Sequence, residues 1–156
     1  MTRTHLDYEL DDSLDRIDID TVHAWLASAY WWQQRELTRE QVVRGFGASA
    51  LVIGAYRDGQ QVAVARVVSD TIRFAWLADV FVAPEHRARG IGRAMVRFAL
   101  DHPRLADVSY WVLATRDAQG VYAALGFAEP EPGHLLQLRR QPLTVSTDAP
   151  ANADSQ

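Results

Sequence analysis

The middle of the chain carries three stretches rich in apolar and β-branched residues, which is the pattern of strands in a sheet. They cover residues 49–56, 61–69 and 72–82. Asp58 and Gly59 stand between the first two stretches, and an Asp-Gly pair between two apolar runs is a strong signal for a tight hairpin turn. We therefore expect three consecutive antiparallel strands.

Two helices are expected before these strands. Asp20 and Thr21 are good N-cap residues for a helix over residues 22–30, in which apolar side chains recur at helical spacing. Thr38, with a glutamine three residues later, forms a capping-box pattern ahead of a short second helix over residues 39–46.

Helix and strand alternate in the second half of the chain. A helix is expected from about Gly90 to Asp101, because several apolar residues share one of its faces: Ile91, Ala94, Met95 and Phe98. A strand over residues 107–115 follows, apolar enough in its second half to be buried. A short helix over residues 117–125 comes next, with Gly126 placed to end it. A final extended stretch is expected over residues 127–140.

With a short first strand over residues 5–10, this order predicts an α+β fold. The fold would hold a mixed, mostly antiparallel sheet, about four helices and one parallel crossover through the helix that starts near Gly90. A chain of 156 residues, 48% of them apolar, fits a single domain. We place that domain at residues 1–145 and expect the small, polar residues 146–156 to be a disordered tail.

Composition narrows the classes of function. The chain carries 16 Lys and Arg against 20 Asp and Glu, a net charge of −4, which argues against nucleic acid as the main partner. It has no cysteine, so disulfides, thiolate metal sites and a cysteine nucleophile are excluded. Its five histidines show no metal-ligand spacing, and no metal is expected. No apolar run is long enough to span a bilayer, so we expect no membrane partner and a cytoplasmic protein.

The densest cluster of positive charge lies at a predicted helix start. Three arginines and two glycines fall within residues 87–93. The first turn of a helix has unpaired N–H groups and a partial positive charge, and Gly90 and Gly92 would let an anion approach them. The cluster therefore predicts a phosphate site.

Two common nucleotide-binding motifs do not match this cluster. A Walker A loop would need Gly-Lys-Ser/Thr, and a dinucleotide fingerprint would need glycine where Met95 stands. Alternatively, the glycines only permit close packing and the arginines are solvated.

Two motifs resemble those of one family. Arg87-Ala88-Arg89-Gly90-Ile91-Gly92 resembles the Arg/Gln-x-x-Gly-x-Gly/Ala signature of the GNAT superfamily, the acetyl-CoA-dependent N-acetyltransferases. The segment over residues 112–127, with its Tyr-x-x-x-Gly-Phe ending, is similar to that family's second cofactor segment.

The resemblance implies a GNAT-like sheet with a splayed central pair of strands that admits acetyl-CoA. It implies that the coenzyme A diphosphate binds backbone amides of residues 87–93: Arg87, Ala88, Arg89, Gly90, Ile91, Gly92 and Arg93. It also implies that the pantetheine arm pairs with the end of the preceding strand as an added strand: Val80, Phe81 and Val82.

Acyl transfer from a thioester needs a neutral amine, a stabilised oxyanion and a leaving thiolate that can take a proton. Tyr122 occupies the position of the family's usual general acid, and a phenol stays protonated at neutral pH. Asp79, an acid in an apolar run, is the candidate general base; alternatively it caps an amide or pairs with an arginine, and water takes the proton. Thr115 and Asp117 are candidate cofactor contacts. Thr115 would equally serve as a helix cap, and for Asp117 the N-cap of the last predicted helix is the favoured alternative.

Three consecutive aromatic residues, Tyr30, Trp31 and Trp32, join the two N-terminal helices, where the family often places the roof of the acceptor pocket. They are candidate substrate contacts, and the alternatives are core packing or a homodimer contact. The prediction is an N-acetyltransferase that moves acetyl from acetyl-CoA to a small-molecule or peptide amine by direct attack in a ternary complex. The alternative is a non-catalytic module that binds or senses coenzyme A.

Overall fold

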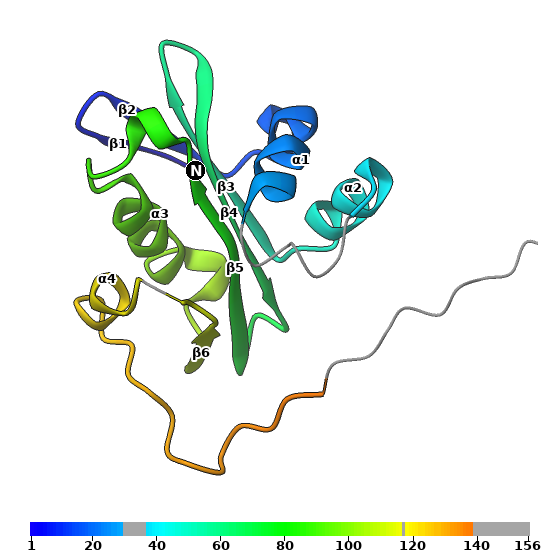
Figure 1. The fold of residues 1–156 in the computed structure, drawn as a ribbon. Helices are drawn as coiled ribbons and strands as arrows, with labels where there is room; N and C mark the ends of the chain where they lie inside the picture. Colours follow the sequence, from blue (N-terminus) through cyan, green and yellow to red (C-terminus); the bar gives the residue numbers. More distant parts are fainter. Residues whose placement is uncertain (30–36, 117, 139–156) are drawn as a thin grey trace, which may run out of the picture.

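The computed structural model describes residues 1–29, 37–116 and 118–138. Its described strands form a single six-stranded sheet in the order β1-β2-β3-β4-β5-β6 (Figure 1). All neighbouring strands pair antiparallel except β5 and β6, which pair parallel. The expected α+β class and the parallel crossover are confirmed. The strands are β1 (Thr2–His5), β2 (Tyr8–Asp11), β3 (Leu51–Arg57), β4 (Gln60–Ser69), β5 (Phe74–Val82) and β6 (Tyr110–Leu113).

Four α-helices accompany the sheet in the described part of the chain. They are α1 (Ile19–Ser28), α2 (Arg39–Gly47), α3 (Ile91–Leu100) and α4 (Gln119–Ala123). Short 3₁₀ turns occupy Leu14–Arg16, Pro84–His86 and Pro103–Leu105.

Capping sets where the first two helices begin. The predicted capping box is confirmed: the Thr38 hydroxyl accepts from the Gln41 N–H, and the Gln41 side chain accepts from the Thr38 N–H. The start of α1 was placed too late, because Asp18 is its N-cap and accepts from the N–H groups of Asp20 and Thr21. Three oxygen-bearing residues within four positions, Asp18, Asp20 and Thr21, left the true cap ambiguous in the sequence.

The two hairpins differ in how well their turn residues suit the turn. Asp58 and Gly59 both have positive φ, as a two-residue turn with right-handed twist requires, and the predicted hairpin of β3 and β4 is confirmed. The expected single first strand is instead the hairpin of β1 and β2, in which Leu6 at the turn has a φ of 52°. Leucine rarely adopts a positive φ, so the sequence carried no turn signal there.

The end of the described chain departs from expectation. The predicted Gly126 ends α4: it has a φ of 93°, its N–H donates to the Ala123 carbonyl, and the Phe127 N–H donates to the Tyr122 carbonyl. The strand predicted from Phe127 onward is absent up to Leu138, because no described strand lies beside this segment to complete a ladder. β6 is also shorter than predicted and only half-buried, since it is the outer strand among the described residues.

Apolar cores lie on both faces of the sheet. On one face α3 buries Met95 and Phe98 against the strands. On the other face α1 and α2 bury Val22 and Phe46 around Phe81 of β5. Figure 1 shows α3 on one side of the sheet and the α1–α2 pair on the other. Among the described helices, none is both long and apolar enough to cross a bilayer.

The α3 core should dominate stability. Met95 is fully buried, so Met95→Ala leaves a cavity and should lower the free energy of unfolding by about 2–5 kcal/mol. Val43→Ala on the exposed face of α2 is the control, with an expected change of about 0.5 kcal/mol or less. Urea unfolding followed by circular dichroism measures both, and equal effects would contradict this account of the core.

Candidate cofactor site

An opening in the sheet defines the site. β6 pairs with β5 only from Phe74 to Leu77, and β6 then ends at Leu113. β5 continues to Val82 with no strand beside this edge among the described residues. Backbone N–H and C=O groups along a free edge are a template for an extended ligand. An opening is therefore present between β5 and β6, but this is not the central pair that was expected, because β6 is the outer strand of the described sheet.

A bulge in β5 accompanies the opening. Ala78 lies opposite Arg66 of β4, yet Phe81 lies opposite Val64, so Asp79 and Val80 share one place in the register. Asp79 has a φ of 51°, a conformation that residues other than glycine seldom adopt. The extra residue returns Phe81 to the α1–α2 face, where it joins that core.

Asp79 is not free within the bulge. Its side chain is 5% exposed, and its Oδ2 pairs with Nε of Arg66 across the two strands. The sequence left two roles open for Asp79, a general base or a partner for an arginine. The structure shows the ion pair, and the general-base role stays a prediction.

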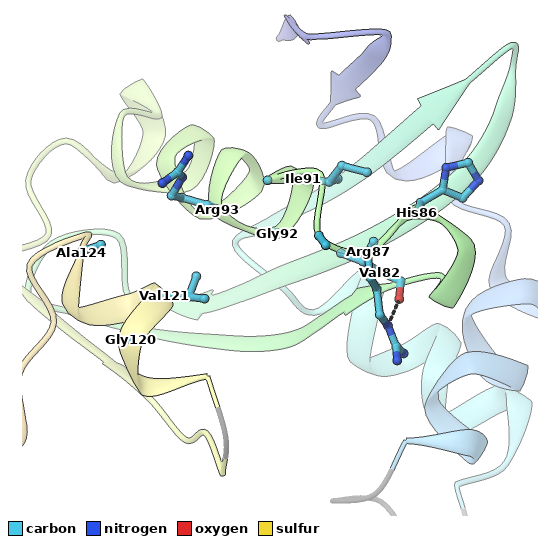
Figure 2. Close-up of a pocket in the computed structure, with 11 residues that line it drawn as sticks. Val82, His86, Arg87, Ile91, Gly92, Arg93, Gly120, Val121 and Ala124 are labelled. Atoms are coloured by element: carbon cyan, nitrogen blue, oxygen red, sulfur yellow. Dashed lines mark hydrogen bonds between the residues drawn. The ribbon is translucent and has the colours of Figure 1, made fainter.

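A pocket of about 500 Å³ lies at the end of the unpaired part of β5 (Figure 2). Its walls come from the end of β5, the loop before α3, the first turn of α3, and α4. The lining residues are Val82, His86, Arg87, Ala88, Gly90, Ile91, Gly92, Arg93, Gly120, Val121 and Ala124. Most of the residues predicted to hold a diphosphate therefore surround one cavity.

The first turn of α3 presents free donors to this pocket. Gly90, the N-cap, has a φ of 76° and no side chain with which to cap the helix. The first backbone bond runs from the Ala94 N–H to the Gly90 carbonyl. The N–H groups of Ile91, Gly92 and Arg93 have no partner in the part of the chain that the structure describes. Such a turn, with the positive end of the helix dipole, suits an anion such as a phosphate.

The arginines of the turn do not share one direction. Arg93 lines the pocket from α3. The Arg87 side chain extends away from α3 and α4 (Figure 2), its Nε donates to the Val82 carbonyl at 3.0 Å, and its guanidinium lies over the Phe81 ring. Trp25 of α1 stacks on the same ring at 5.3 Å. Arg87 thus lines the pocket, while its guanidinium places a positive charge on the α1–α2 face.

The β1–β2 hairpin supports the loop before α3 through His5 of β1 and Tyr8 of β2, which contacts His86 of the loop. Nε2 of His5 lies 3.3 Å from the Arg89 carbonyl, and a Cβ at Gly90 would meet that same nitrogen. Nδ1 of His86 lies 3.1 Å from the Tyr8 hydroxyl, with the two rings edge to face. His86 lies one position before the arginine-glycine turn in the sequence, and the structure places it in the pocket wall.

α4 closes the far side of the pocket with Gly120, Val121 and Ala124. These residues were not among the predicted contacts, although Gly120 and Ala124, four apart, fall on one face of a helical turn. Tyr122, the candidate acid, is adjacent to them but does not line the pocket. Its ring packs edge to face on Phe127 at 5.9 Å, and burial raises the pKa of its phenol.

The remaining predicted contacts are placed as follows. The Thr115 hydroxyl accepts from the Ala118 N–H at 3.1 Å, so it supports the start of α4, and its cofactor role stays a prediction. Asp117 and the aromatic residues Tyr30, Trp31 and Trp32 lie outside the described residues. No three histidine or acidic side chains gather as a metal site in the described ranges.

Comparison with known proteins decides the family. A family model described as "Acetyltransferase (GNAT) domain" matches residues 48–129, more than half of the chain. The chain belongs to the GNAT acetyltransferase family. The match covers β5, residues 83–90, α3 and α4, and it includes all the residues that line the pocket.

Two solved structures share most of the fold. A GNAT-family protein from Xanthomonas campestris pv. campestris is 37% identical with a TM-score of 0.79, over 89% of this chain and 95% of that chain. An acetyltransferase structure from Clostridium acetobutylicum, which was solved with acetyl-CoA, has a TM-score of 0.64 at 16% identity, over 89% and 96% of the two chains.

Curated relatives of this GNAT chain are longer than it is. N-acetyltransferase Eis of Mycobacterium tuberculosis (strain ATCC 25177 / H37Ra) is 37% identical over 113 residues, which are 70% of this chain and 27% of Eis. Protein FG08082 of Gibberella zeae is 25% identical over 112 residues, 60% of this chain and 63% of that protein. The chain therefore spans less than two thirds of the length of these relatives.

Gly92 offers a direct test of the pocket. A Cβ there would meet only Cγ2 of Val82, at 3.8 Å, so Gly92→Val should fold and fill the space beside the α3 amides. Losing one or two charge-assisted hydrogen bonds should weaken coenzyme A binding about 100-fold.

Isothermal calorimetry measures that loss, and Gly47→Val at the exposed end of α2 is the matched control, because nothing lies within 4 Å of its Cβ position. If coenzyme A raised the Tm of Gly92→Val as much as that of the wild type, the pocket would be wrongly placed.

Proposed function

We propose that this GNAT protein is an acetyl-CoA-dependent N-acetyltransferase that acetylates an amine. The observation that carries the proposal is the uncapped first turn of α3, which faces a pocket at the end of the unpaired part of β5. The pocket supplies donors for a diphosphate, and the strand edge supplies donors and acceptors for an amide-bearing arm. The acetyl-CoA in the Clostridium acetobutylicum structure supports this choice of cofactor.

The residues present fit coenzyme A. The amides of Ile91, Gly92 and Arg93 would hold the diphosphate, and the guanidinium of Arg93 would add charge at the same pocket. Val80, Phe81 and Val82 would pair with the pantetheine arm along the free edge of β5. When bound, acetyl-CoA supplies a thioester carbonyl that a neutral amine attacks.

Backbone and phenol groups would then assist the transfer. A backbone N–H near Phe81 or Val82 would stabilise the oxyanion, because fixed donors in a water-poor site stabilise developing charge strongly. The Tyr122 phenol would hold the proton that the leaving thiolate takes. Burial raises the Tyr122 pKa, so the protonated form needed by an acid persists to higher pH than in a free tyrosine.

The amine must lose a proton, for which Asp79 and water are the two candidate acceptors. The Asp79 side chain is almost fully buried and its Oδ2 is engaged by Arg66. A solvent route needs no buried group to break an existing ion pair, so we favour water. The reaction would then accelerate as the pH rises toward the pKa of the acceptor amine.

The acceptor would approach from the α1–α2 face, opposite the pocket wall formed by α3. Trp25, Phe81 and Arg87 form a stacked group on that face. The substrate roles of Tyr30, Trp31 and Trp32, the choice between small-molecule and peptide amines, and a homodimer contact remain predictions.

Tyr122→Phe tests the acid. The rate of thiol release from acetyl-CoA should fall about 100-fold with a panel of amines, the lower range for a lost general acid, while the Kd for coenzyme A stays unchanged. Tyr110→Phe on the exposed face of β6 is the control and should keep wild-type rates. The pH–rate profile of Tyr122→Phe should lack any alkaline decline due to phenol ionisation.

Two outcomes would count against the proposal. Wild-type rates in Tyr122→Phe would remove Tyr122 from the chemistry. Tight coenzyme A binding by the wild type without turnover on any amine would instead support the non-catalytic module.

A further inference from the structure

The bulge in β5 holds a buried charge that the proposed chemistry does not use. Asp79 lies where β5 has just parted from β6, two residues after the last paired position, Leu77. Its backbone is in the left-handed region, which aspartate tolerates better than most residues but not without strain. A strained residue next to a ligand site calls for a compensating interaction in the surrounding structure.

Arg66 provides that interaction from β4. Its Nε pairs with Oδ2 of Asp79, and both side chains are largely removed from solvent. Leaving either charge alone in this environment would be strongly unfavourable, so each side chain restricts where the other can go. The pair therefore fixes the Asp79 side chain against β4 at the register shift.

The same guanidinium also contacts the end of α2. Its NH1 group lies 3.4 Å from the Gly45 carbonyl and 3.5 Å from the Ser49 hydroxyl, and the guanidinium lies over the Phe46 ring. The Ser49 hydroxyl in turn donates to the Gly45 carbonyl at 2.8 Å. One cation thus joins the bulge to the helix pair that covers the proposed acceptor face.

The bulge decides how the next residues are presented. Without the extra residue, the alternation of β5 would reverse, and Phe81 would leave the α1–α2 core for the α3 face. The backbone of Val80, Phe81 and Val82 would then turn its free edge in another direction. An interaction that stabilises the bulge therefore also sets the direction of the strand edge that would pair with the pantetheine arm.

We propose that Asp79 is a positioning residue, whose ion pair with Arg66 holds the bulge that directs residues 80–82 toward the cofactor. The proposal rests on the proposed acetyl-CoA site and replaces the general-base role for Asp79. It predicts that Arg66 matters as much as Asp79, and that both act on coenzyme A binding before any chemistry occurs.

The test compares Asp79→Asn, Arg66→Gln and the double variant by calorimetry with coenzyme A and by steady-state kinetics. Each single variant should weaken coenzyme A binding by about tenfold or more, since a buried charge is left unpaired. The double variant also lacks the ion pair but leaves no unpaired charge, so its coenzyme A affinity should fall no further than in either single variant, and turnover at saturating acetyl-CoA should be retained. Asp20→Asn, in the exposed pair with Arg39, is the control and should change neither.

The general-base role makes the opposite predictions. Asp79→Asn would then lose turnover with an unchanged coenzyme A Kd, Arg66→Gln would bind normally, and the double variant would stay inactive because no carboxylate returns. Any of these results, or strictly additive losses in the double variant, would overturn the positioning role.

Two features keep the test decisive. The double variant buries no lone charge, so it remains folded for measurement even if a single variant does not, and circular dichroism with a Tm for each variant reports this. A wild type that fails to bind coenzyme A would instead refute the proposed function itself, so the two failures are distinguishable.

Discussion

The structure depends on one unpaired edge: five residues at the end of β5, from Ala78 to Val82, pair with β4 on one side, but among the described residues no strand lies on their other side beyond the end of β6. Backbone N–H and C=O groups seek partners, and a free edge is normally a liability that proteins cover. Here the edge runs directly into a pocket lined by the start of α3. A ligand that is extended at one end and anionic at the other would pair with the backbone groups of the β5 edge and with the free N–H groups at the start of α3.

The parts that build this arrangement come from distant positions in the chain. The β1–β2 hairpin supports the phosphate loop through His5 and through Tyr8, which meets His86. β4 supports the bulge through Arg66. α4 supplies a small-residue wall, and its helix end ties Tyr122 to Phe127. The site is thus built from elements of the whole fold.

Local signals in the sequence predicted most of the elements. The Thr38 capping box, the Asp58-Gly59 turn and the glycines of the phosphate turn all act within a few residues, so they are legible without a structure. The expected anion site at the start of α3 follows from the same local physics. For such local features the residue types alone determine the backbone geometry.

What the sequence did not predict depends on long-range partners. The strand expected after Phe127 has no described neighbour with which to pair, and apolar alternation cannot reveal that. The direction of Arg87 is set by the Val82 carbonyl and the Phe81 ring, which only the fold brings near it. The partner of Asp79 comes from another strand for the same reason.

The most direct test of this account is a crystal structure of the protein with coenzyme A. The account predicts diphosphate oxygens within hydrogen-bond distance of the N–H groups of Ile91, Gly92 and Arg93, with the pantetheine arm alongside residues 80–82. Coenzyme A bound elsewhere, or a first turn of α3 whose amides are satisfied by the protein's own side chains, would contradict it.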